Sequence, residues 1–405
     1  MSIIKLPNAK SLIINVLDSN EFSSLKESRK RFILNVLLCF LSIKGRINFL
    51  QLSRFSKYCE QYFRINFENK FNFQDFNLRL ILNLKIKECI IAFDPSFITK
   101  SGKCTFGLGK YWSGCAKQAK WGLDICGFAV IDILQNTAFH LNAIQTPPFE
   151  NMTLLDYYCK IVKENYLYFK ELSDYMVADA YFSKKKVVDT MLSLRLHFIS
   201  RLRDDAILMY NYNGEPTGKK GRPKMYDGKV NSYNFNMNYF TENYSDKEMK
   251  IYSAIVYCKA FKRDIKLAVA IYYKNGKEVT RKLYFSTDFE LCAEKIVRYY
   301  RSRFQIEFLY RDAKQHCGLM QCQARSQNKL HFHFNAALTA VNLAKIEWLY
   351  AKTSTDEPFS MLNYKTMYNN ELLLNAFIQR FAINANTVKN KQIISELRNY
   401  GKIAA

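Results

Sequence analysis

The stretch KECIIAFD (residues 87–94) is an apolar, β-branched run that ends on an acidic residue, Asp94. A short apolar run of this kind is typical of a buried strand. Similar runs follow it and predict four more strands, interleaved with two amphipathic segments that predict helices. The strands are expected at 121–133, 137–146, 174–180 and 197–203, and the helices at 151–170 and 183–194. This order predicts an α/β fold with one mixed sheet and flanking helices.

The segments on either side of this pattern divide the chain further. Residues 205–285 begin with a polar, Gly-rich loop and continue as strands that predict an antiparallel meander, SYNFNMNYF (232–240) among them, with KNGK as a hairpin turn. Residues 285–315 predict one long helix capped by Thr287 and Asp288. The expected domains are 1–85, a helical N-terminal part; 86–204, the first part of the α/β domain; 205–285, a β-rich insertion; 286–350, its second part; and 351–405, a tail of short helices.

The N-terminal part is basic, and it predicts two helices separated by a break at Gly45, the second of them capped by Asn48. Two interpretations are open for this region. It is either a helix-turn-helix unit that binds DNA or a small helical bundle that makes no DNA contact.

The charge of the chain indicates its class of partner. Its 405 residues include 60 Lys and Arg against 36 Asp and Glu, a net charge of +24. Such an excess favours a polyanionic partner, and nucleic acid is the commonest one. A membrane surface is disfavoured because no basic amphipathic segment dominates the sequence.

The cysteines and the N-terminus bear on the compartment. The 11 cysteines show no C-x-x-C pair and no zinc-ligand spacing, which predicts reduced core thiols. The N-terminus lacks the pattern of a signal peptide, and the longest apolar run, at 32–43, is too short to span a bilayer. We therefore expect a soluble, cytoplasmic protein with no membrane partner.

Two aspartates occupy similar positions in the predicted sheet. Asp94 ends the strand 87–94, and Asp179 lies at the end of DYMVADA (174–180). Either residue alone is well explained as a turn or cap residue. Together they suggest a site, because functional side chains gather at strand ends in open α/β sheets.

A third acid, Glu307, lies in the basic stretch YRSRFQIEFLYRDAK (300–314). On a helix at 100° per residue, it shares one stripe of about 80° with four other side chains. These are Tyr300, Arg303, Arg311 and Lys314. Read alone, the stripe is a solvated basic face in which Glu307 forms i,i+4 ion pairs. Read with the two aspartates, it supplies a third metal ligand and cations for a phosphate backbone.

With all three acids in place, the chain resembles the DDE transposases of bacterial insertion sequences, in the family conventionally numbered four. The signature Y-x2-R-x3-E-x6-K is matched without a gap by Tyr300, Arg303, Glu307 and Lys314. IIAFDPSFITKSG (90–102) and YMVADAYFS (175–183) resemble the two Asp regions of that family, and the resemblance covers roughly residues 88–345.

The resemblance implies an RNase H-like catalytic domain interrupted by a β-rich insertion. It implies that Asp94, Asp179 and Glu307 bind two Mg²⁺ ions, for which Mn²⁺ would substitute, and that Tyr300, Arg303 and Lys314 contact DNA phosphates. It further implies terminal inverted repeats and target DNA as partners and a homodimer on paired ends. The cytoplasmic location would then be that of a bacterial, nucleoid-associated protein. The expected activity is DNA cleavage followed by strand transfer. The alternatives are an RNase H-like nuclease without strand transfer and a catalytically silent DNA-binding protein derived from a transposase.

Three further features are open to two interpretations each. Arg222, in GRPK, would enter a narrow minor groove or belong to a plain basic loop. Arg311 would contact DNA beside the signature residues or lie on a solvated face. Trp112 and Trp121, which flank a Lys-rich segment, would stack on bases or, as we expect more, anchor a loop to the core.

Overall fold

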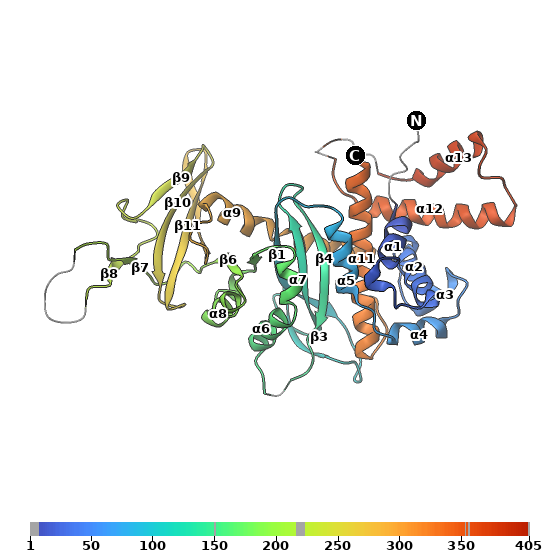
Figure 1. Cartoon of the computed structure of the whole chain (residues 1–405), viewed down its shortest axis with the longest axis horizontal. Helices are drawn as coiled ribbons and strands as arrows, with labels where there is room; N and C mark the ends of the chain where they lie inside the picture. Colours follow the sequence, from blue (N-terminus) through green and yellow to red (C-terminus); the bar gives the residue numbers. More distant parts are fainter. Residues whose placement is uncertain (1–7, 150, 216–222, 353, 355–356, 404–405) are drawn as a thin grey trace.

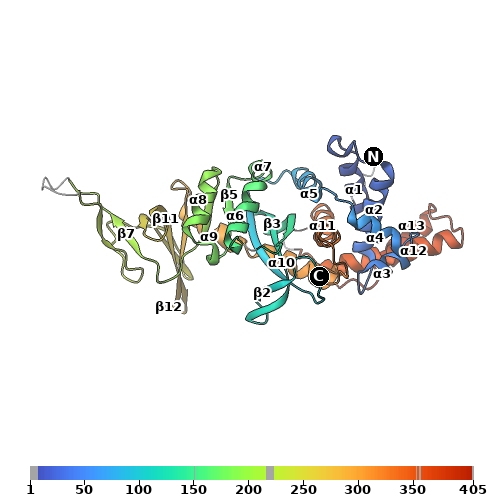
Figure 2. The same cartoon turned by 90° about the horizontal axis from the view of Figure 1, so that it is seen from below.

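A computed structural model of the chain describes residues 8–149, 151–215, 223–352, 354 and 357–403. The molecule is elongated, with a β-rich part at one end, a helical part at the other end and an α/β part between them (Figure 1). The same order is seen after a quarter turn (Figure 2). The N-terminal helices and the last helices lie together in the helical part.

One mixed sheet runs through the α/β part and into the β-rich part. Its strands follow the order β2-β3-β1-β5-β6-β12-β11-β10-β7-β8, with β4 paired to β3 and β9 paired to β10. Strand β5 is parallel to both β1 and β6, and the other pairings are antiparallel. The strands of the α/β part are β1 (Cys89–Thr99), β2 (Gly109–Ser113), β3 (Gln118–Asp132), β4 (Thr137–Gln145), β5 (Tyr175–Val177) and β6 (His197–Arg201). The fold is therefore mixed α/β with flanking helices, as the sequence predicts.

Strand β1 is longer than predicted. It continues past Asp94 to Thr99, because residues 95–99 pair with residues 122–126 of β3. The expectation that Asp94 ends a strand is wrong, and the residue instead lies within β1, opposite Gly127. The parallel partner β5 does end early, at Val177, so Asp94 lies where its parallel neighbour stops.

The β-rich part is antiparallel and joins the same sheet where β12 pairs with β6. Its strands are β7 (Leu208–Asn211), β8 (Tyr226–Lys229), β9 (Thr241–Ser245), β10 (Met249–Cys258), β11 (Arg263–Lys274) and β12 (Lys277–Ser286). The KNGK turn joins β11 and β12, with positive φ at Asn275 (53°) and Gly276 (74°), as a tight hairpin requires.

One strand predicted in this part is absent from the described residues. The stretch 232–240 forms turns, and the strand begins only at Thr241. Its asparagines explain the difference, because Asn231 and Asn236 each accept a hydrogen bond from the backbone N–H two residues later. Such local side-chain bonds favour turns over a strand ladder.

The helical part is built around α11 (Gln327–Ala351), which is largely buried. Four N-terminal helices pack against it: α1 (Ala9–Leu17), α2 (Glu27–Ser42), α4 (Glu60–Glu68) and α5 (Phe73–Leu82), while α3 (Phe49–Arg54) packs against α4. The break at Gly45 (φ 92°) and the Asn48 cap on α3 are both present. Phe332 of α11 lies in an aromatic cluster, with ring centroids 4.3 Å from Phe67 and 5.0 Å from Phe73.

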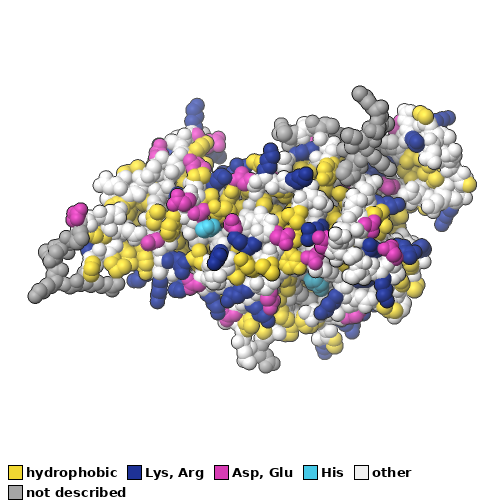
Figure 3. Space-filling model, in the orientation of Figure 1, with side chains coloured by type: hydrophobic (Ala, Val, Ile, Leu, Met, Phe, Trp, Pro, Cys, Tyr) yellow, Lys and Arg dark blue, Asp and Glu magenta, His cyan; other side chains and the backbone are white. Residues whose placement is uncertain are grey.

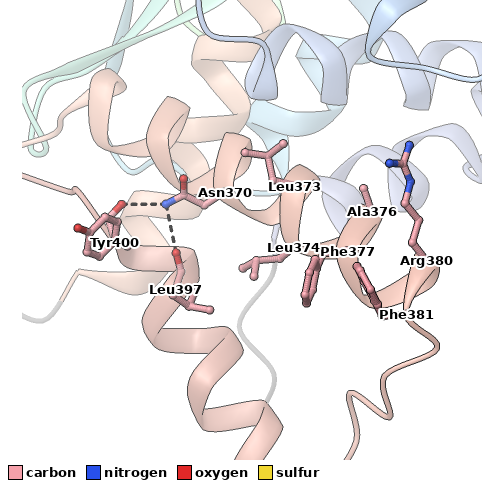
Figure 4. A pocket seen from close by; sticks show the side chains of 9 residues that line it. All are labelled: Asn370, Leu373, Leu374, Ala376, Phe377, Arg380, Phe381, Leu397 and Tyr400. Atoms are coloured by element: carbon pink, nitrogen blue, oxygen red, sulfur yellow. Dashed lines mark hydrogen bonds between the residues drawn. The ribbon is translucent and has the colours of Figure 1, made fainter.

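The chain ends in α12 (Met361–Arg380) and α13 (Val388–Asn399), so the tail contains one long helix and one shorter one. Between them lies an apolar groove lined by Leu373, Phe377 and Phe381 of the α12 segment and by Leu397 and Tyr400 (Figure 4). Asn370 holds the two helices together by donating to the backbone oxygens of Leu397 and Tyr400.

The long helix predicted over 285–315 is two helices, α9 (Ala293–Ser302) and α10 (Gln305–His316). The Thr287 cap is also wrong. Its hydroxyl accepts a hydrogen bond from the backbone N–H of Phe198 at 2.8 Å, which ties it to β6, and the helix begins six residues later. The remaining helices are the α6 (Leu154–Glu164), α7 (Tyr166–Lys170) and α8 (Lys185–Ser193) segments of the α/β part.

The surface carries many basic groups. On the face shown in Figure 3, Lys and Arg side chains are spread over the β-rich and α/β parts, with acidic side chains among them. All 11 cysteines are free thiols, but only six are buried. Cys59, Cys104, Cys115 and Cys292 are exposed and Cys89 is half-buried, so the prediction of core thiols is wrong for these five. None of the helices in the described ranges combines the length and the apolar character needed to cross a bilayer.

Phe332→Ala should lower the free energy of unfolding by about 3–5 kcal/mol, because it removes a buried ring that joins α11 to the N-terminal helices. Chemical denaturation followed by circular dichroism would measure this. Phe381→Ala is the matched control, because Phe381 is 67% exposed and its loss should change stability by less than about 0.5 kcal/mol. Equal effects of the two substitutions would contradict the packing described.

Candidate acidic site

Asp94 and Asp179 lie side by side because their strands are parallel and in register. Ile91 pairs with Met176 and Ala92 with Val177, so each aspartate lies two residues beyond the second pair. Asp179 caps the short 3₁₀ helix Ala180–Phe182, and its Oδ1 accepts a hydrogen bond from the Tyr181 N–H. Both aspartates line a cavity of about 520 Å³. The sequence prediction that these two residues share a site agrees with this placement.

Glu307 is connected to the aspartates through Arg303. This arginine follows the last residue of α9, and its side chain is 10% exposed. Its Nη2 donates to Glu307 Oε1 at 2.9 Å, and its Nη1 lies 3.5 Å from Asp94 Oδ1. The guanidinium therefore bridges an acid on α10 and an acid on β1.

The electrostatics of Asp94 show how crowded the acids are. Burial raises the pKa of Asp94 to about 7; the positive charge of Arg303 opposes this rise, and the negative charges of Asp179 and Glu307 add to it. Asp94 thus interacts with both other predicted acids. An additional positive charge close to this carboxyl group would lower its pKa and stabilise its ionised form.

Lys314 and Tyr300, the other two signature residues, flank this bridge. Lys314 donates from Nζ to Ser96 Oγ on β1 at 2.9 Å, and burial lowers its pKa. The Tyr300 ring packs on Tyr284 with centroids 5.0 Å apart, and burial raises its pKa. The negative charge of Asp179 also raises the pKa of Tyr300, so this phenol lies toward the aspartates.

The helix α10 is fixed to β1 by a contact that sequence reasoning missed. Tyr310 is buried and donates its hydroxyl proton to the backbone oxygen of Asp94 at 2.8 Å. A Cβ at Gly127 would lie 1.9 Å from this hydroxyl oxygen, so the approach requires glycine at that position of β3. Tyr310 and Gly127 therefore determine how closely α10 approaches β1, the strand that carries Asp94.

One predicted DNA-binding residue, Arg311, is not part of this cluster. Arg311 lies over the Phe308 ring at 4.7 Å, and its Nη2 is 3.2 Å from Asp312 Oδ1. Its side chain is 54% exposed, so it remains a prediction as a DNA contact. Arg222 lies outside the described residues.

A fourth acid, Asp124, also lines the cavity and was not predicted. It is 5% exposed, and its Oδ2 accepts hydrogen bonds from Thr146 Oγ1 at 2.6 Å and from the Tyr158 hydroxyl at 3.1 Å. Burial raises its pKa to about 6. The sequence did offer a signal for Asp124, because it is an aspartate inside the apolar run 121–133. A charged side chain in a buried strand needs hydrogen-bond or ion-pair partners, which indicates a special role.

The acids fit a divalent metal in chemistry, since carboxylate oxygens are the ligands that Mg²⁺ prefers. Among the described residues, however, no group of three or more His, Cys, Asp or Glu side chains is close enough to hold a metal ion. The Arg303 guanidinium lies between two of these acids, with Nη1 3.5 Å from Asp94 Oδ1 and Nη2 2.9 Å from Glu307 Oε1.

Residues 159–343 match the profile of a family described as the transposase DDE domain. The match covers less than half of the chain, includes Asp179 and Glu307, and begins after Asp94. A search of curated proteins found no match. The family match supports a DDE transposase, in agreement with the signature residues of α9 and α10.

Asp94→Asn should stabilise the protein at pH 8 by on the order of 2 kcal/mol and much less at pH 4. The Asp94 carboxyl has a pKa of about 7 in the folded state and about 4 in the unfolded chain, so folding favours its protonated form. Wild-type stability therefore falls as pH rises through this window, whereas the asparagine does not titrate. Denaturation at pH 4, 6 and 8 would measure the difference.

Asp205→Asn is the control for this experiment, because the Asp205 side chain is 72% exposed. It should change stability by less than about 0.5 kcal/mol at each pH. If Asp94→Asn is less stable than the wild type at pH 8, the prediction is contradicted. The ionised Asp94 carboxylate would then be stabilised by its partners in the folded protein.

Proposed function

We propose that this protein is an insertion-sequence transposase that cuts DNA at the ends of its element and joins those ends to target DNA. The observation that carries the proposal is that Arg303 bridges Asp94 and Glu307, while Asp179 lies beside Asp94 in the same cavity. The family match over residues 159–343 supports the same class of protein.

Asp94, Asp179 and Glu307 would hold two Mg²⁺ ions, or Mn²⁺ in their place, which would activate the attacking oxygen and stabilise the leaving oxygen. In the first reaction, water attacks a phosphodiester and releases a 3′-OH. In the second, this 3′-OH attacks a phosphodiester of target DNA and displaces its 3′ oxygen. Both reactions exchange one P–O bond for another, so one site serves both.

The basic neighbours of the acids would orient the DNA backbone. Lys314 donates a hydrogen bond to Ser96 on β1, and Tyr300 lies close enough to Asp179 to feel its charge, so both could contact a phosphate next to the acids. Cations at such positions offset the repulsion between acids and phosphates. The net charge of +24 supplies long-range attraction for the same partner.

Arg303 would have two alternative partners. In the structure it neutralises Asp94 and Glu307. A DNA phosphate is an equally good bidentate partner for a guanidinium. We propose that bound DNA draws Arg303 away from the acids, which frees both carboxylates for cations at the moment when substrate is present.

The remaining parts of the chain have proposed roles that follow from the resemblance. The helices of residues 1–85 would bind DNA, residues 86–204 and 286–350 would form an RNase H-like catalytic domain, and residues 205–285 would be an insertion within it. A homodimer would hold the paired inverted repeats. The tail at 351–405 has no proposed role in catalysis.

Asp94→Asn, Asp179→Asn and Glu307→Gln should each reduce Mg²⁺-dependent cleavage by at least about a thousandfold, because each removes a charged oxygen ligand from a shared site. The substrate would be a duplex that carries the inverted repeats flanking the gene, and gel analysis of end-labelled DNA would follow the cleavage. DNA affinity should change little, which separates lost chemistry from lost binding.

Two further outcomes would decide between this proposal and its alternatives. A pre-cleaved end that yields no joined products with the wild-type protein would favour a nuclease without strand transfer. A wild-type protein that binds the ends but never cuts them in Mg²⁺ or Mn²⁺ would favour a silent, transposase-derived DNA-binding protein.

Arg303→Ala should bind Mn²⁺ several-fold more tightly than the wild type in the absence of DNA, because it removes a cation that competes for Asp94 and Glu307. Electron paramagnetic resonance of free Mn²⁺ would measure this. The double variant Arg303→Ala, Glu307→Gln is the control and should lose most of the gain. Unchanged or weaker Mn²⁺ binding by Arg303→Ala would contradict the proposed competition.

A further inference from the structure

The hairpin of β2 and the start of β3 exposes two tryptophans to solvent. Trp112 is 67% exposed and Trp121 is 61% exposed, whereas the third tryptophan of the chain, Trp348, is 7% exposed. The expectation that Trp112 and Trp121 anchor a loop to the core is therefore wrong. Tryptophan is highly buried in most proteins, so two such side chains on one hairpin indicate a surface that binds something.

The register of the hairpin places both rings on the same face. Lys110 pairs with Trp121, and Trp112 pairs with Ala119. Because paired residues in an antiparallel ladder point to the same side, the two tryptophans are diagonal neighbours there. Lys110 lies on this face as well, with its ammonium 5.9 Å from the Trp121 ring centroid. Trp112, Trp121 and Lys110 are called the tryptophan face below.

The tryptophan face borders the acid cavity. Lys110 and Trp112 line this cavity together with Asp94 and Asp179. Figure 2 shows β2 projecting from the α/β part on the side where α10 lies. A molecule that binds in the cavity therefore lies next to the tryptophan face, so we expect the partner of this face and the substrate of the acids to be the same molecule.

The charge of the hairpin selects the chemistry of the partner. Residues 101–123 contain Lys103, Lys110, Lys117 and Lys120 and contain no Asp or Glu. A second copy of this surface would be repelled by its four positive charges. A partner that is both anionic and rich in flat rings is a nucleic acid whose bases are exposed, because duplex DNA hides the faces of its bases.

We propose that the tryptophan face stacks an unpaired nucleotide of the DNA next to the acid cavity. Trp112 supplies the ring nearer to the aspartates, and Trp121 supplies a second ring toward Lys110. The inference rests on the proposed function in that the substrate is taken to be DNA. It adds that the DNA is locally unpaired where it meets the acids, which would let a single strand reach a cavity of this size.

The test compares two probes with the full-length protein in EDTA, where no cleavage takes place. One probe is a fluorescein-labelled oligo(dT) of 15 nucleotides, and the other is a labelled 20-base-pair duplex. Trp112→Ala and Trp121→Ala should each weaken oligo(dT) binding by roughly five- to a hundredfold, as expected for one lost stacking contact, and duplex binding by less than about threefold. Fluorescence anisotropy would measure both affinities.

Three matched variants make the result specific. Trp112→Phe should keep most of the oligo(dT) affinity, because a phenyl ring still stacks. Lys110→Ala should weaken both probes by a similar factor, because it removes a positive charge beside the rings and leaves both rings in place. Phe381→Ala removes an aromatic side chain that is as exposed as Trp112, at 67%, but lies on the C-terminal helices, and it should change neither affinity.

Three outcomes would overturn the proposal. The first is oligo(dT) binding by Trp112→Ala and Trp121→Ala that equals the wild type. The second is an equal loss for both probes, which would assign the hairpin to backbone contacts alone. The third is a change of oligomeric state on size-exclusion chromatography, which would make this face a contact between copies. None of these measurements uses the inverted repeats or depends on cleavage. A protein whose acids are catalytically inactive would therefore not, for that reason, give any of the three outcomes.

Discussion

The ion pairs of Arg303 hold the candidate site together. Without a cation, the buried carboxyl groups of Asp94 and its neighbours repel one another, and this repulsion helps to raise the pKa of Asp94 to about 7. The guanidinium joins β1 to α10 and is itself almost fully buried, with its Nε lacking a hydrogen-bond partner in the described structure. Such a bridge is well placed to be exchanged, because carboxylates also bind metal ions and a guanidinium also binds phosphate.

The break between α9 and α10 gives this arginine its place. A single straight helix over 300–314 would carry all the signature residues on one rigid stripe. In the structure, α9 packs on β6, β11 and β12, whereas α10 lies over β1, β3 and β4, so the two helices follow different parts of the sheet. Arg303 lies at the joint, with Tyr300 on one side and Glu307 and Lys314 on the other. The same residues thus face the aspartates, but from two helices.

Several features of the fold were predictable because they depend on neighbours in the sequence. The strands around 89–99, 118–132 and 137–145 follow from apolar, β-branched runs, and the Asn275–Gly276 turn follows from its need for positive φ. Features that depend on distant contacts were missed. The extension of β1 past Asp94 needs β3 as a partner, and the start of α9 is delayed because Thr287 is bound to β6.

The sequence by itself determined the three acids, the signature around Glu307, the excess of positive charge and the mixed α/β class, because each depends on residue type and short spacing. Only the tertiary structure decided how these parts meet. The parallel register of β1 and β5 places Asp94 beside Asp179, Arg303 separates Asp94 from Glu307, and Asp124 joins the cavity from β3. The tertiary structure likewise decided the exposure of Trp112 and Trp121. The sequence does not show whether an aromatic side chain is covered by the core or exposed to water.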